Sequence, residues 1–184
     1  METPQYTPWK RLERKRIYDN PWITVWEDQV LNPNGGRNLY GLVSFKNRAI
    51  GIIPIDDGGY TWLVGQSRYA LGSAYSWEIP MGGGPLSEDP LQAAARELKE
   101  ETGLQAEDWQ ELIRLHTSNS VTDELGIAYI ARGLTQGETD FDEMEDLELR
   151  RIPLEEAVNM ALEGEITDSL SVAALMKAKI VLGL

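Results

Sequence analysis

Four glutamates crowd one short stretch of this sequence: Glu88, Glu97, Glu100 and Glu101. The last three are related as i, i+3 and i+4, so on an α-helix their side chains lie on one face. Because like charges repel at that spacing, such a cluster either retains protons or is neutralised by a hard cation such as Mg²⁺, which prefers oxygen ligands. The cluster by itself leaves two alternatives open, a divalent-metal site and a solvated acidic face.

The residues around the glutamates predict the helix that positions them. Asp89 can cap its start, Pro90 suits its first position and Gly103 can end it. Apolar residues at i, i+3, i+4 and i+7 predict a buried stripe on the side opposite the glutamates. The stripe consists of Leu91, Ala94, Ala95 and Leu98. The helix is therefore expected to have one face for the core and one for chemistry.

Two further features flank the acidic face. Arg96 lies beside it and can hold one carboxylate by a bidentate hydrogen bond. The triple glycine at 82–84 precedes the helix and predicts a tight turn with positive φ angles. No Lys-Ser/Thr pair follows these glycines, so they do not form a phosphate-binding P-loop.

Taken together, these residues fit the pattern G-x5-E-x7-R-E-L-x-E-E-x-G-L from Gly82 to Leu104. The pattern resembles the complete signature of the Nudix hydrolases. The resemblance implies that Glu97 and Glu101 are the principal metal ligands, and that Glu100 and the Met81 carbonyl add coordination. It further implies that Glu88 fixes Arg96, that Arg96 and Glu100 serve catalysis, and that the metal is Mg²⁺, with Mn²⁺ as the alternative.

Segments on either side of this box narrow the resemblance. Gln66-Ser67-Arg68-Tyr69 and Trp77-Glu78-Ile79-Pro80 are similar to segments of the pyrophosphatases that split ADP-ribose and nucleoside-diphosphate sugars. The similarity implies that Arg68 contacts the substrate phosphates and that Glu78 and Gly82 lie at the substrate. An acidic run at 142–146 corresponds to a loop that supplies a general base in some members. Glu143 is the first choice for that base and Glu145 the second, against the alternative of an acidic loop without a role.

The N-terminal region is expected to serve dimerisation. The resemblance implies that residues 1–45 form a β extension that joins two copies, and that 46–184 form the Nudix domain. Trp22 either stacks on the nucleobase or is buried in the core of the extension. The basic residues near the start are expected to be a solvated segment rather than a binding patch. These are Lys10, Arg11, Arg14, Lys15 and Arg16.

One departure from the pattern broadens the expected substrate range. ADP-ribose-selective members carry a proline shortly after the box, whereas here none occurs between Pro90 and Pro153. ADP-glucose or GDP-mannose therefore stay possible substrates. Two other functions also stay open: a Nudix hydrolase of nucleoside triphosphates or RNA 5′ ends, and a non-catalytic nucleotide-binding module.

The remaining periodicity predicts a mixed-sheet α/β (α+β) fold. Strands at 22–30 and 38–45 flank a turn signal at 32–36 and predict a hairpin, and 49–55 with 60–65 predict a second one. Further strands are expected at 77–79, 111–115, 126–131 and 147–152, and further helices at 153–163 and 169–181. The resemblance implies the Nudix fold, a mixed sheet sandwiched between helices, after an N-terminal β-hairpin extension.

Composition limits the partners and the chemistry. The chain has 184 residues, and 30 acidic against 17 basic side chains give a net charge of -13, so neither nucleic acid nor membrane is an expected partner. There is no cysteine, which excludes a thiolate site and makes a reducing cytoplasm the expected location. The one histidine, His116, is expected to be structural or surface-exposed. Catalysis should therefore depend on metal and carboxylates.

Overall fold

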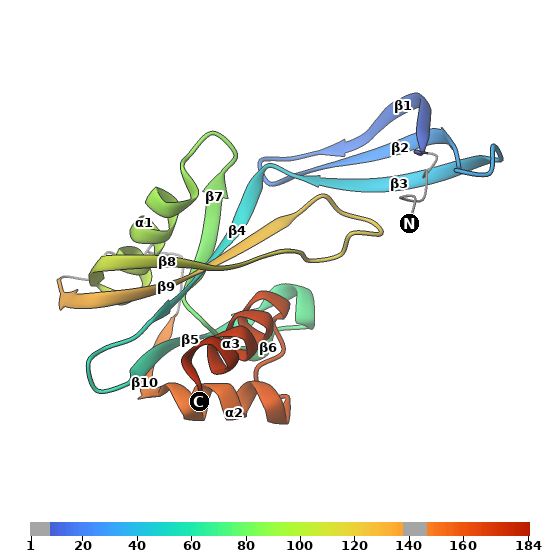
Figure 1. Cartoon of the computed structure of the whole chain (residues 1–184). Coiled ribbons are helices and arrows are strands. Elements are labelled where there is room, and N and C mark those ends of the chain that lie inside the picture. Colours follow the sequence, from blue (N-terminus) through green and yellow to red (C-terminus); the bar gives the residue numbers. More distant parts are fainter. Residues whose placement is uncertain (1–7, 138–146) are drawn as a thin grey trace, which may run out of the picture. The chain divides into compact units, whose positions relative to one another are not determined.

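The computed structural model describes residues 8–137 and 147–184 (Figure 1). Of these, 8–46 and 118–124 form one compact unit, and the remaining residues from 47 onward form a second. Glu143 and Glu145 lie outside the described residues, so their predicted role as general base stays a prediction. Within the described ranges, no helix combines the length and apolar character that a membrane crossing requires.

The first unit contains a three-stranded antiparallel sheet in the order β1-β2-β3. Its strands are β1 (Lys10–Asp19), β2 (Ile23–Leu31) and β3 (Arg37–Phe45). The predicted hairpin of β2 and β3 is confirmed, and Gly35 takes a φ of 82° in its turn. The basic segment was expected to be merely solvated. It is exposed, but it forms β1, which pairs with β2 along its length, and Arg14 adds two hydrogen bonds of 2.7 and 2.6 Å to Asp28 on β2.

The second unit is built on a four-stranded mixed sheet in the order β7-β4-β9-β8. Its strands are β4 (Asn47–Pro54), β7 (Met81–Pro85), β8 (Leu104–His116) and β9 (Leu125–Gln136). Strands β4 and β9 run parallel, and the other neighbours are antiparallel. Five consecutive residues of β4 are buried, which places this strand at the centre of the core.

Helices cover both faces of this sheet (Figure 1). Helix α1 (Pro90–Thr102) packs Ala93, Ala94 and Leu98 on one face. On the other face lie α2 (Leu154–Glu163), α3 (Ser169–Leu182) and a second sheet in the order β10-β5-β6. Its strands are β5 (Tyr60–Arg68), β6 (Ala74–Glu78) and β10 (Glu148–Pro153), with a 3₁₀ turn at Tyr69–Leu71. The predicted mixed sheet between helices is confirmed.

The second predicted hairpin is wrong. Strands β4 and β5 follow each other in sequence but belong to different sheets, since β4 pairs with β7 and β9 while β5 pairs with β10 and β6. Both edges of β4 are therefore occupied, and no edge is left for β5 to pair with. An apolar run buried on both faces does not reveal which strands will flank it.

Candidate active site

Helix α1 begins and ends where its local signals predict. The Asp89 side chain accepts hydrogen bonds from the backbone N–H groups of Leu91 and Gln92, at 3.0 and 3.2 Å, and Pro90 is the first helical residue. Gly103 ends the helix in the left-handed region, with a φ of 71°. These ends determine which turn of the helix carries each glutamate.

The predicted buried stripe of α1 is only half right. Leu91 and Ala95 are exposed, whereas the glutamates at 97 and 101 are buried, with exposed fractions of only 8% and 6%. The buried positions 94, 97, 98 and 101 keep the i, i+3, i+4, i+7 spacing, but two of the four are acidic. The core face and the acidic face of the helix therefore overlap rather than oppose each other.

The triple glycine explains how the helix can bury carboxylates. The predicted positive-φ turn is wrong, because Gly82 and its two successors are extended in β7, paired with β4, and none has a positive φ. A Cβ atom on Gly82 would lie 2.0 Å from Oε2 of Glu97, and one on Gly84 would lie 2.8 Å from Ile50. Glycine is therefore required here for close approach between strand and helix, not for turning.

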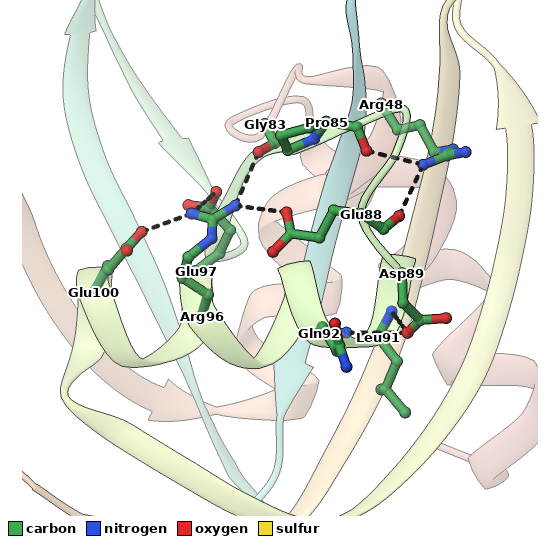
Figure 2. A network of polar contacts seen from close by, with 10 residues as sticks. All are labelled: Arg48, Gly83, Pro85, Glu88, Asp89, Leu91, Gln92, Arg96, Glu97 and Glu100. Atoms are coloured by element: carbon green, nitrogen blue, oxygen red, sulfur yellow. Dashed lines mark hydrogen bonds and ion pairs between the residues drawn. The ribbon is translucent and has the colours of Figure 1, made fainter.

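Arg96 is the hub of the acidic cluster (Figure 2). Its Nη1 donates to Glu97 and Glu100 at 2.7 and 2.8 Å. Its Nη2 donates to the Gly83 carbonyl at 3.0 Å and to Glu88 at 3.3 Å. The expected contact between Glu88 and Arg96 is present. The Arg96 guanidinium thus joins the segment before α1, the middle of α1 and β7.

The electrostatics of the hub favour a permanently charged guanidinium. Burial lowers the pKa of Arg96, but the hydrogen bond to Glu88 and the charges of Glu97 and Glu100 outweigh it and raise this pKa above its ordinary value. Glu101, one turn further along α1 from Glu97, accepts a hydrogen bond of 2.8 Å from the backbone N–H of Met81. Three carboxylates thus contact one guanidinium, and negative charge is in excess.

The donors at this site suit a hard divalent cation. They are carboxylate oxygens in negative excess, two of them held in a cradle that only glycine leaves open. Within residues 8–137 and 147–184, however, no three acidic or histidine side chains are gathered as a metal-binding group. The reason is that Arg96 holds Glu97 and Glu100, so a cation would have to draw these carboxylates away from the guanidinium.

Arg48 supports the site and was missed by the sequence analysis. Its guanidinium donates to three backbone carbonyls of the segment before α1, at 3.2 Å to Pro85 and 3.3 Å to Glu88 (Figure 2) and at 3.0 Å to Leu86. About forty residues separate Arg48 from that loop, so no local pattern could reveal the contact. Arg48 fixes the backbone from which the Glu88 side chain reaches Arg96.

Arg68 and Glu78, predicted at the substrate, contact each other. Nε of Arg68 donates to Glu78 at 2.9 Å, and Nη2 makes a second hydrogen bond to the same carboxylate. The hydrogen bond that Arg68 donates to Glu78 raises the pKa of Arg68, and the charges of Asp168 and Glu101 act in the same direction. Arg68 therefore lies within electrostatic range of the acidic cluster on α1 and of the start of α3.

Trp22 and His116 are both exposed. Trp22 begins the turn into β2 in the first unit, and 66% of its surface is exposed, so the alternative of a tryptophan buried in the hairpin core is wrong. Its predicted role in stacking on a nucleobase stays a prediction. His116 is the last residue of β8 and is exposed, as expected for a surface histidine.

The site thus consists of a helix rich in carboxylates that packs on a strand of glycines, in a mixed sheet covered by helices. The model of the NUDIX domain matches residues 45–174, and that of the nucleoside diphosphate sugar hydrolase N-terminal domain matches residues 9–43. The chain belongs to the NUDIX domain family, which confirms the resemblance seen in the sequence. Members of this family depend on divalent metal ions.

Similar proteins cover nearly the whole chain. An ADP-ribose pyrophosphatase of Mycobacterium tuberculosis is 36% identical over 168 residues, which is 90% of this chain and 80% of that protein. A methanol dehydrogenase activator of Bacillus methanolicus is 33% identical, over 90% of both chains. A crystal structure of an ADP compounds hydrolase superposes with a TM-score of 0.86 at 24% identity, over 98% of this chain and 97% of that one, and shares the fold.

Proposed function

We propose that this protein is a Mg²⁺-dependent hydrolase that cleaves the pyrophosphate linkage of ADP-ribose or a related nucleoside-diphosphate sugar. The products are a nucleoside monophosphate and a sugar phosphate. The observation that carries the proposal is the burial of Glu97 and Glu101 against the glycine strand, where carboxylates in excess need a cation. The match to the nucleoside diphosphate sugar hydrolase N-terminal domain and the similarity to ADP-ribose pyrophosphatases support the substrate class.

Glu97 and Glu101 would hold the metal, with Glu100 and the Met81 carbonyl as further oxygen donors. When bound, Mg²⁺ lowers the pKa of a coordinated water and offsets the charge of the phosphate oxygens. Mn²⁺ takes similar oxygen ligands and is the alternative cofactor. Arg96 keeps Glu97 and Glu100 near one another. Glu88 in turn keeps Arg96 in place, and Arg48 holds the loop that carries Glu88.

The remaining roles belong to residues beyond the helix. Arg68 uses Nε and Nη2 for Glu78, and its Nη1 is the group we assign to the substrate diphosphate. Gly82 leaves room for the Glu97 carboxylate beside β7, and we propose that this glycine lies at the substrate. Glu143 is the proposed general base for the attacking water, and Glu145 is the second choice.

The proposal includes a homodimer joined through residues 1–45, with Trp22 stacked on the nucleobase. Large apolar side chains are exposed on the first unit, as at an uncovered protein interface. They are Trp9, Leu12, Ile17, Tyr18, Trp22 and Leu39. Sedimentation at micromolar concentration tests the dimer, and a monomer alone would contradict it. The proposed location is the cytoplasm, in line with the cysteine-free composition.

Product analysis tests the reaction. Incubation with ADP-ribose, ADP-glucose and GDP-mannose, with and without Mg²⁺, should give two phosphomonoester signals by ³¹P NMR only when metal is present. Failure to hydrolyse any of the three with Mg²⁺ or Mn²⁺ would overturn the proposal. Nucleoside triphosphates and capped RNA ends in the same panel test the other hydrolase function, and tight nucleotide binding without turnover would favour the non-catalytic module.

A further inference from the structure

A pocket of about 410 Å³ lies where β5, β6 and the start of α3 meet. Its volume is within the range of small-molecule sites, about 300–1,000 Å³. Figure 1 shows these three elements next to one another in the second unit. The lining residues are Arg68, Ala70, Leu71, Ser76, Glu78, Thr167, Asp168 and Ser169. Three of them, from 167 to 169, belong to no motif that the sequence analysis used.

The wall formed by β5 and β6 presents hydrogen-bonding groups from buried residues. Glu78 is only 3% exposed, and Arg68 holds its carboxylate. Ser76 is only 6% exposed, and it lines the pocket. A serine hydroxyl can both donate and accept a hydrogen bond, so one that lines a pocket is suited to a polar ligand.

The wall formed by the start of α3 adds acceptors and hydroxyls. One oxygen of Asp168 caps the helix by accepting from the Ser171 backbone N–H at 2.7 Å, which leaves its other oxygen for the pocket. Thr167 and Ser169 flank it with hydroxyls. Together with Ser76, three hydroxyls and two carboxylates line the pocket, against one guanidinium.

A short segment of the chain connects the pocket to the acidic cluster on α1. The buried Ser171 hydroxyl accepts from the Ile79 backbone N–H at 3.1 Å, and two residues further on the N–H of Met81 donates to Glu101. Arg68 borders the pocket, and the charges of both Asp168 and Glu101 raise its pKa. A diphosphate between the cluster and Arg68 would therefore place its substituent in the pocket.

We propose that this pocket binds the sugar of the nucleoside-diphosphate sugar, with Ser76, Thr167, Asp168 and Ser169 holding the sugar hydroxyls. The inference rests on the proposed function. A sugar hydroxyl both donates and accepts, which suits carboxylates and hydroxyls. A phosphate is disfavoured because carboxylates outnumber the guanidinium, and a base is disfavoured because no aromatic side chain is among the lining residues.

Substitutions that keep the fold test the pocket. Asp168→Asn retains a good helix cap but removes the charged acceptor, and Thr167→Val removes a hydroxyl at constant shape. For ADP-ribose, we expect each to raise KM about 10-fold with kcat nearly unchanged, as for a lost hydrogen bond to substrate. For an ADP alkyl ester, which has the diphosphate but no second sugar, we expect kcat and KM to stay within about twofold of the wild-type values. Ser67→Ala, on the opposite face of β5, is the matched control. It should change neither kcat nor KM for either substrate.

Direct binding gives a second readout. Ribose 5-phosphate titrated into the wild type should perturb NMR signals of residues 167–169, and Asp168→Asn should weaken this binding. Equal losses for ADP-ribose and the alkyl ester, or ribose 5-phosphate binding that the variant does not change, would overturn the assignment. A wild type that binds ribose 5-phosphate in the pocket but hydrolyses no nucleotide sugar would contradict the proposed function and leave the sugar site standing.

Discussion

Glu101 accepts a 2.8 Å hydrogen bond from the backbone N–H of Met81. This bond ties the last turn of α1 to the first residue of β7, so a predicted metal ligand is held by the residue whose carbonyl is predicted to join it. The carboxylate is oriented before any cation arrives, and such supporting contacts raise the affinity of a metal site.

Replacing Glu101 with glutamine separates its two roles. Glu101→Gln keeps an oxygen that can accept from Met81 but loses the charge, so the fold should survive while kcat falls by several orders of magnitude. Circular dichroism and steady-state kinetics with Mg²⁺ check both parts. Glu107→Gln, at an exposed position of β8, is the control, and wild-type turnover in Glu101→Gln would exclude the ligand assignment.

Adding a methyl group to Gly82 should disturb the glycine strand. In Gly82→Ala the new Cβ would lie 2.0 Å from Glu97, so the carboxylate or the helix must move. We expect a loss of about 1–3 kcal/mol in the free energy of unfolding, together with a large loss of activity. Urea denaturation measures the first. Gly41→Ala in β3 is the control, because no atom lies within 4 Å of its new Cβ, and it should change neither stability nor activity. A Gly82→Ala variant with wild-type stability and activity would contradict the close approach.

Arg48 should matter for catalysis although it is not part of the box. Arg48→Met removes three hydrogen bonds to the loop before α1, which frees Glu88 and through it Arg96. We expect kcat to fall about 10- to 100-fold with KM little changed, as for contacts that orient metal ligands. Arg48→Lys should restore part of the activity. A loss confined to thermal stability, with full kcat at low temperature, would argue for a purely structural role.

The pair of Arg14 and Asp28 should give the first unit a pH-dependent stability. The hydrogen bond from Arg14 lowers the pKa of Asp28 below its ordinary value, so this carboxylate stabilises the folded state above about pH 4. The contribution is lost as the pH falls through the lowered folded-state value. Asp28→Asn should therefore cost about 1–2 kcal/mol at pH 7 and little near pH 2. Denaturation curves at both pH values check this, and an equal cost at both would refute it.

Much of the site follows from local sequence. The ends of α1, the spacing of its glutamates and the family all depend on residues within one stretch of 23 positions, because capping and helix periodicity act between near neighbours. The hairpin of β2 and β3 was predictable for the same reason, since its turn lies between the two strands.

Contacts between distant segments depended on the tertiary structure. The sequence shows Leu91 and Ala95 as apolar, but only the packing of α1 on β7 decides that Glu97 and Glu101 are buried in their place. Three other features likewise join residues about thirty or more positions apart. They are the pairing of β4 with its neighbours, the hydrogen bonds of Arg48 to the loop before α1, and the pocket beside Asp168. Helix periodicity states which side chains share a face, while the shape of the opposing surface decides which face is buried.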